Sequence, residues 1–140
     1  HVGHKNFRDY MKVMRKCLKP EGLFLLHTIG NDKTHSTCDP WIEKYIFPNG
    51  EIPSLSQIAP ALEGQFVLED LHNFGAYYDK TLMAWYHNFE AHFPDKGSQF
   101  YRMWKYYLLT CAAAFRARKL ELWQFVLSPD GVPGVYERPL

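Results

Sequence analysis

The 140-residue sequence contains no long apolar run, no excess of charge of either sign and no closely paired cysteines. A membrane-spanning helix needs about 18 or more mostly apolar residues in a row, and no stretch approaches that length. Sixteen Lys and Arg residues stand against fifteen Asp and Glu, which gives a net charge of +1. Such a chain has no global field that attracts nucleic acid or an anionic membrane, so any contact with either must be local.

The cysteines and histidines do not form a recognisable ligand set. Cys17, Cys38 and Cys111 contain no CxxC pair, which argues against a disulfide framework and against a zinc site. Seven histidines are present, but their spacing is not that of metal ligands. His35 shares a loop with Cys38, and no further ligand is nearby. We therefore expect no metal site, and the cysteine usage indicates a reducing, cytoplasmic compartment.

Motifs for phosphate binding and for nucleophilic catalysis are also missing. The sequence has no GxGxxG turn, no Walker loop and no nucleophile elbow built on Ser or Cys. Aromatic residues, in contrast, are abundant: ten Phe, nine Tyr and four Trp make up 16% of the chain. That is more ring surface than a core of this size needs, and it indicates an apolar cavity that tolerates a cation.

The hydrophobic pattern predicts an α/β fold in the order helix, strand, helix, strand, helices, strand. Helices are expected over residues 5–18, 41–47, 54–62, 79–93 and 98–119, and strands over 23–29, 65–71 and 121–127. The first strand is a continuous apolar run, which is typical of a strand buried on both faces of a parallel sheet. Residues 134–140 are expected to form a loose tail.

Two polar side chains follow predicted strands and are candidate site residues. His27 lies at the carboxyl end of the first strand, where open α/β sheets bind ligands. A core histidine bonded to a neighbouring carbonyl is an equally good interpretation. Tyr78 follows the second strand, and the sequence leaves open whether its hydroxyl meets a ligand or its ring only packs. Asp79 is interpreted as the N-cap of the next helix.

The longest helix ends in the cations Arg116, Arg118 and Lys119. Positive charge is favourable at the carboxyl end of a helix, and this explains Lys119. For the two arginines, contact with a lipid phosphate stays open. The aromatic residues along the two long helices are interpreted mainly as core residues. The two helices could also form the walls of an apolar tunnel.

Several segments resemble the cyclopropane-fatty-acyl-phospholipid synthases. The resemblance runs in family order from residue 1 to about 126, and it is closer than the resemblance to the related mycolic-acid cyclopropane synthases. It rests on HVG at 1–3, LKPEG at 18–22, LLHTIG at 25–30, WIEKYIFPNG at 41–50, IPS at 52–54, DLHNFGAYY at 70–78, DKTLMAWY at 79–86, YYLLTCAAAFRAR at 106–118 and LWQ at 122–124.

The resemblance implies an S-adenosylmethionine-dependent methyltransferase that adds a methylene across a cis double bond of a phospholipid acyl chain. Because an alkene is a poor nucleophile, the sulfonium methyl group must be held against it in a dry pocket. Methyl transfer leaves a carbocation, and a base deprotonates the new methyl group so that the ring closes. The resemblance implies that this base is bicarbonate, held by the side chain of His27, the backbone of Ile29 and the hydroxyl of Tyr78.

The resemblance further implies that residues 1–140 are a single partial domain, the carboxyl-terminal half of a Rossmann-like methyltransferase sheet with added helices. It implies three strands here, with the last one antiparallel and central. The cofactor turn and the family's remaining bicarbonate ligands, a Glu and a Cys, precede His1 in the family. We therefore expect no cofactor-binding residues in this chain, and neither activity nor measurable S-adenosylmethionine affinity from it alone. The open edge of the first strand is expected to favour self-association or a homodimer.

Two classes of function follow from these observations. The first is the lipid-facing and base-holding part of a bacterial cyclopropane synthase, acting on phospholipid acyl chains at the inner face of the membrane. The second is a non-catalytic lipid-binding or interaction remnant of the same fold. A mycolic-acid or fatty-acid methyltransferase is a related alternative. No nucleic acid partner is expected, and the preferred head group and acyl chain stay open.

Overall fold

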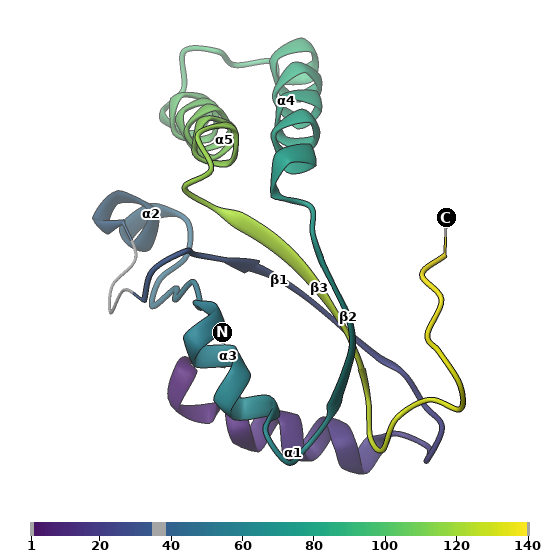
Figure 1. Ribbon diagram of the computed structural model, residues 1–140. Coiled ribbons are helices and arrows are strands. Elements are labelled where there is room, and N and C mark those ends of the chain that lie inside the picture. The colour runs from purple at the N-terminus through teal and green to yellow at the C-terminus, as the bar shows by residue number, and fades with distance from the viewer. Residues whose placement is uncertain (1, 35–38, 140) are drawn as a thin grey trace.

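The computed structural model describes residues 2–34 and 39–139 (Figure 1). The elements alternate between helix and strand as the hydrophobic pattern predicts, which confirms the α/β class. They are a 3-10 turn η1 (His4–Asn6), α1 (Phe7–Cys17), β1 (Phe24–Gly30), α2 (Pro40–Tyr45), α3 (Leu55–Leu62), β2 (Val67–Asn73), α4 (Gly75–His92), α5 (Gln99–Arg116) and β3 (Glu121–Ser128). No helix within the described ranges is long and apolar enough to cross a membrane.

The strands form one sheet in the order β1-β3-β2, and β3 runs antiparallel to both neighbours. This confirms the expectation that the last strand is antiparallel and central. In the register, Gly30 pairs with Glu121, and Asn73 pairs with Trp123. The carboxyl-terminal ends of β1 and β2 therefore lie at the same end of the sheet, beside the start of β3.

The expectation that the first strand is buried on both faces and paired in parallel is wrong for the described chain. Burial along β1 alternates: Leu25 is 52% exposed, whereas Phe24 and Leu26 pack on the core. The ladder partner of β1 is the antiparallel strand β3, and the strand lies at the edge of the sheet. A continuous apolar run does not distinguish such an edge strand from a central parallel one.

Two hydrophobic cores hold the elements together. The first lies between one face of the sheet and the helices α1 and α3, and it contains Met11, Ile58, Ala61, Leu62, Trp123, Phe125 and Leu127. The second lies where the α4–α5 hairpin meets the carboxyl-end edge of the sheet, and it contains Leu82, Leu108, Ala112, Phe115 and Leu122. Figure 1 shows α1 and α3 along the sheet, with the α4–α5 hairpin beyond the ends of the strands.

The helix α4 begins at Gly75, earlier than the predicted start at Asp79. The side-chain oxygen of Asn73 accepts a hydrogen bond from the Gly75 N–H at 2.9 Å and so satisfies one of the free donors of the first turn. Asp79 is therefore inside the helix, and the interpretation of this residue as the N-cap is wrong. The helix α5 ends at Arg116, before its predicted end, because the backbone turns into the left-handed region at Arg118, where φ is 58°.

The described residues after β3 form no helix or strand, and Val135 is 86% exposed, as expected for a loose tail, but the segment is tied to β2 at two points. The guanidinium of Arg138 donates to both carboxylate oxygens of Asp70, at 2.6 and 2.7 Å. These bonds hold the pKa of Asp70 below its usual range. The carboxylate of Glu69 accepts hydrogen bonds from the Val132 N–H at 3.0 Å and from the hydroxyl of Ser128.

Candidate functional site

A row of polar side chains crosses the sheet on the face opposite the first core. His27 of β1 and His72 of β2 both pair with Gln124 of β3, so the three side chains share one face. The side-chain nitrogen of Gln124 lies 3.1 Å from Nδ1 of His27. His27 is exposed, so the alternative of a core histidine bonded to a carbonyl is wrong.

Gln124 engages one of the two ring nitrogens of His27. Its side-chain amide hydrogen-bonds Nδ1, and the direction of this bond follows the tautomer of the ring. Nε2 is the ring nitrogen that Gln124 does not engage.

Ile29 lies two positions after His27 on the same face of β1, and its ladder partner is Leu122. The carbonyl of Leu122 accepts a hydrogen bond from the Phe74 N–H at 2.6 Å, which ties the start of α4 to β3. The side chain of Leu122 belongs to the second core. Through Leu122, the backbone of Ile29 is joined to the hairpin that carries Tyr78.

Tyr78 lies in the first turn of α4 and packs against the second core. Its ring meets that of Phe115 edge-on at 5.0 Å and that of Trp85 at 5.9 Å. Burial raises the pKa of the Tyr78 phenol, and the nearby Cys111 adds to the effect. The hydroxyl therefore stays protonated at neutral pH and is able to donate a hydrogen bond to an anion.

A second half-buried phenol, Tyr107 of α5, lies beside the same thiol. Burial, followed by Cys111 and Tyr78, raises the pKa of Tyr107 to about 12. Its ring contacts Trp104 at 5.5 Å and Phe47 at 6.0 Å. The sequence pattern places Tyr107 in the core stripe of α5 and gives no signal that separates it from the other rings of that helix. The structure adds it to the polar groups around Tyr78.

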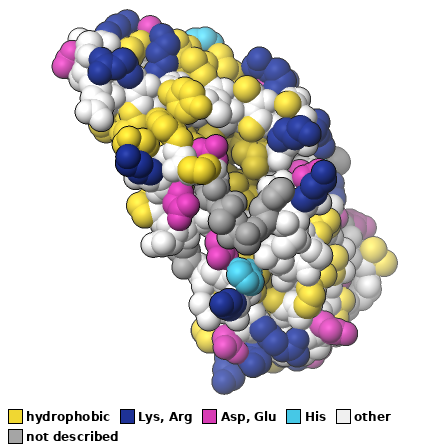
Figure 2. All heavy atoms as spheres, turned by 90° about the vertical axis from the view of Figure 1, so that its left-hand side faces the viewer, with side chains coloured by type: hydrophobic (Ala, Val, Ile, Leu, Met, Phe, Trp, Pro, Cys, Tyr) yellow, Lys and Arg dark blue, Asp and Glu magenta, His cyan; other side chains and the backbone are white. Residues whose placement is uncertain are grey.

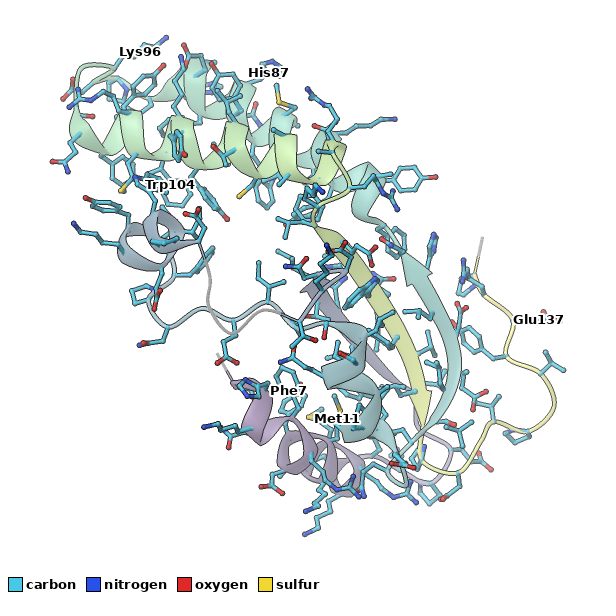
Figure 3. All side chains as sticks on the ribbon, turned by 60° about the vertical axis from the view of Figure 1, so that its left-hand side comes forward. Phe7, Met11, His87, Lys96, Trp104 and Glu137 are labelled. Atoms are coloured by element: carbon cyan, nitrogen blue, oxygen red, sulfur yellow. The ribbon has the colours of Figure 1, made fainter. Side chains whose placement is uncertain are left out.

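The described residues show no direct contact between His27 and Tyr78. A cavity of about 270 Å³ lies on the α1 side of the sheet, which is the face opposite the His27 side chain, and Phe7 and Met11 line it from α1 (Figure 3). Tyr78 does not line this cavity. That His27 and Tyr78 converge on one polar pocket stays a prediction.

An ion pair fixes the two long helices close to Tyr78. Nε and Nη2 of Arg116 each donate to the Asp79 carboxylate at 2.9 Å. These bonds hold the pKa of Asp79 below its usual range. Because they engage two of the guanidinium nitrogens, the geometry favours a structural role for Arg116 over the lipid-phosphate contact considered from the sequence.

Metal binding finds no support in the part of the chain that the structure describes. No group of three or more His, Cys, Asp or Glu residues gathers there at distances that suit an ion. His35 and Cys38, which the sequence places in one loop, lie outside the described residues. The protonated phenol of Tyr78 is a hydrogen-bond donor, which suits an anion better than a cation.

Comparison with known proteins gives consistent matches. Residues 1–125 match the family model for mycolic acid cyclopropane synthetase. The cyclopropane-fatty-acyl-phospholipid synthase of Escherichia coli K12 is 58% identical over 132 residues, which are 91% of this chain and 35% of that protein. The cyclopropane synthase MmaA2 from Mycobacterium tuberculosis has a TM-score of 0.80 at 25% identity, covering 91% of this chain and 51% of that chain. The mycolic acid cyclopropane synthase CmaA1 complexed with SAH and CTAB has a TM-score of 0.78 at the same identity and coverage.

The higher identity to the phospholipid enzyme than to the mycolic-acid enzymes confirms the order of resemblance predicted from the sequence. The three-stranded sheet and its helices are part of the Rossmann-like fold of S-adenosylmethionine-dependent methyltransferases. The chain spans only 35% of the length of the Escherichia coli relative. By the family model that matches most of its length, the chain belongs to the mycolic acid cyclopropane synthetase family.

Proposed function

We propose that the protein carrying this chain is an S-adenosylmethionine-dependent cyclopropane-fatty-acyl-phospholipid synthase. It transfers a methylene to the cis double bond of an unsaturated phospholipid acyl chain. The observation that carries the proposal is the 58% identity to the Escherichia coli enzyme of that name across 91% of this chain. The phenol of Tyr78 and the ring nitrogen Nε2 of His27 support it, because the closing step of this reaction needs a base held near a carbocation.

In this proposal, His27, Ile29 and Tyr78 hold bicarbonate. When bound, bicarbonate supplies the base that removes a proton from the new methyl group. His27 offers Nε2 to bicarbonate, since Gln124 engages Nδ1. Tyr78 keeps its proton because burial raises the pKa of its phenol, so it donates to the base and does not compete for the proton. The rings around Tyr78 exclude water from the cation and face it with π-electrons.

We propose that the chain is the carboxyl-terminal part of the methyltransferase domain and that S-adenosylmethionine binds mainly to residues outside it. The absence of a glycine-rich turn in this sequence supports this division. We expect the 140-residue chain alone to be inactive and to show no measurable heat of S-adenosylmethionine binding. Micromolar affinity in a calorimetric titration of the chain would contradict the division.

We further propose that the enzyme works in the cytoplasm, at the inner face of the membrane, and takes its acyl chains from the bilayer surface. The edge position of β1, with Leu23 and Leu25 about half exposed, supports self-association of the chain along this strand. Light scattering of the 140-residue chain should show self-association that a Leu25→Lys variant loses, and a monodisperse monomer would contradict this proposal.

Lipid analysis of cells that make the full-length protein tests the proposed activity. Unsaturated phospholipid acyl chains should gain the mass of one methylene and become resistant to hydrogenation under conditions that reduce alkenes. The same mass gain with the double bond displaced and a methyl branch would indicate a related fatty-acid methyltransferase. Unchanged lipids together with retained lipid binding would indicate the non-catalytic alternative.

A further inference from the structure

A groove runs between α2 and the first turns of α5, away from the residues assigned to the base. Its volume is about 240 Å³. The ring of Trp41 meets that of Tyr106 edge-on at 4.5 Å. The groove is lined by Trp41, Tyr45, Gln99, Arg102, Met103 and Tyr106.

The aromatic side chains around this groove are unusually exposed. Tyr45 is 42% exposed, Tyr106 is 52% exposed, and Phe100, in the first turn of α5, is 49% exposed. Figure 2 shows hydrophobic side chains gathered on the upper part of this face, with Lys and Arg side chains around them. A contiguous apolar patch with a polar rim marks an interaction site on a soluble domain. Tyr and Trp, with an apolar body and a polar tip, are the residues that favour the boundary between lipid and water.

Two cations on this surface have no acidic partner among the described residues. Lys44 lies over the Tyr45 ring with its Nζ 5.0 Å from the centroid, and Arg102 donates to the backbone carbonyl of Gly97. The neighbouring Lys96 and Lys105, in contrast, lie within 4 Å of the Glu90 carboxylate. Lys44 and Arg102 therefore keep N–H donors available for an outside anion.

We propose that the α2–α5 groove docks on the surface of an anionic phospholipid bilayer. Lys44 and Arg102 meet lipid phosphates, and the rings of Tyr45 and Tyr106 enter the head-group layer. This inference rests on the proposed function and names the surface through which the enzyme reaches its substrate. Two free cations beside a cluster of rings fit a lipid surface better than a nucleic acid, which needs a row of phosphate contacts.

Aromatic side chains of α5 connect this groove with the residues around Tyr78. Trp104 lies on α5 within the same turns as Arg102 and Tyr106, and Figure 3 shows it on the side of the helix near α2. The Trp104 ring meets that of Tyr107, whose phenol lies in the polar cluster with Tyr78. A lipid that lands between α2 and α5 is therefore next to the aromatic wall that surrounds the proposed base site.

Vesicle flotation of the full-length protein tests this surface. The vesicles contain dioleoyl phosphatidylglycerol and phosphatidylethanolamine, with phosphatidylcholine vesicles as the uncharged comparison. The double variant Lys44→Glu/Arg102→Glu should lower binding to the anionic vesicles by about tenfold or more, since each cation near an anionic surface contributes to binding. Lys44→Gln/Arg102→Gln, which only neutralises the charges, should give a smaller loss, and Tyr45→Ser/Tyr106→Ser should weaken binding to both kinds of vesicle.

The matched controls are Lys16→Glu/Lys19→Glu for the charges and Tyr77→Ser for the rings. Lys16, Lys19 and Tyr77 are exposed and do not line the groove. These controls should bind as the wild type does, and circular dichroism verifies that every variant is folded. Unchanged binding in the folded groove variants, or an equal loss in the controls, would overturn the proposal.

The outcome separates this inference from the proposed activity. If the groove variants bind vesicles and form the cyclopropane ring as the wild type does, the docking surface is rejected and the proposed activity stands. Groove-dependent binding by a wild-type protein that forms no cyclopropane ring would support the surface and reject the activity. For an active enzyme, the groove variants should lose turnover on vesicles while they keep it on lipid dispersed in neutral detergent micelles.

Discussion

Replacing His27 by Ala, or Tyr78 by Phe, in the full-length enzyme should lower kcat by about a hundredfold or more, the scale of a lost acid–base contribution. The lipid KM should change little, because neither side chain is assigned to the acyl chain. Each substitution removes one group proposed to hold the base, the imidazole of His27 or the phenol of Tyr78. The base acts after methyl transfer has begun, so the loss should appear in kcat and kcat/KM together. Steady-state assays of cyclopropane formation on vesicles measure both constants.

The chain offers matched controls for both substitutions. His92 is exposed at the end of α4 and bonds only to the Asn88 carbonyl among the described residues, so His92→Ala should keep wild-type kcat. Tyr77→Phe makes the same chemical change as Tyr78→Phe on the adjacent residue, which is 62% exposed. Added bicarbonate should partly restore the His27→Ala and Tyr78→Phe variants if they bind the base weakly. Wild-type turnover in either variant would remove that residue from the site.

The helices and strands were predictable because the patterns that mark them are local in the sequence. Which strand pairs with which depends on residues that are far apart in the sequence. Apolar residues at helical spacing and the Pro and Gly breakers predict five helices and three strands close to those observed. The central place of β3 came only from the family resemblance, because no periodicity states which strand pairs with which. The prediction that β1 is buried on both faces was wrong for the same reason. Leu25 lies on an exposed face of the sheet, and the apolar run alone predicts that this face is covered.

The sequence predicts candidate site residues but not all of their surroundings. Tyr78 comes after β2, in the first turn of α4, as the pattern predicts, whereas His27 lies in the middle of β1 and not past its end. The start of α4 was missed because the side chain of Asn73, not that of Asp79, caps the first turn. Tyr107 was missed because its raised pKa arises from tertiary burial beside Cys111, which the stripe of α5 does not reveal.

Replacing Gly30 by Ala should destabilise the folded protein by about 3 kcal/mol, at the upper end of the cost of an overpacked core. A Cβ at this position would lie 2.0 Å from Cζ3 of Trp123 and within 2.5 Å of two further atoms of the same ring. Such an overlap requires either the indole or the end of β1 to move.

The surroundings of Trp123 leave it little room to yield. The side chain is 2% exposed, its N–H donates to Glu121 at 2.7 Å, and its ring meets Phe125 edge-on at 6.0 Å. The strand end must therefore shift, and with it the backbone of Ile29 that is proposed to hold the base. Urea unfolding of the full-length protein should show a lower midpoint for Gly30→Ala, and kcat should fall even where the variant is fully folded. Gly97→Ala is the matched control, because its new Cβ meets only one Asp95 oxygen at 3.5 Å. Equal midpoints for the two variants would show that the indole repacks without strain and that β1 tolerates a side chain at residue 30.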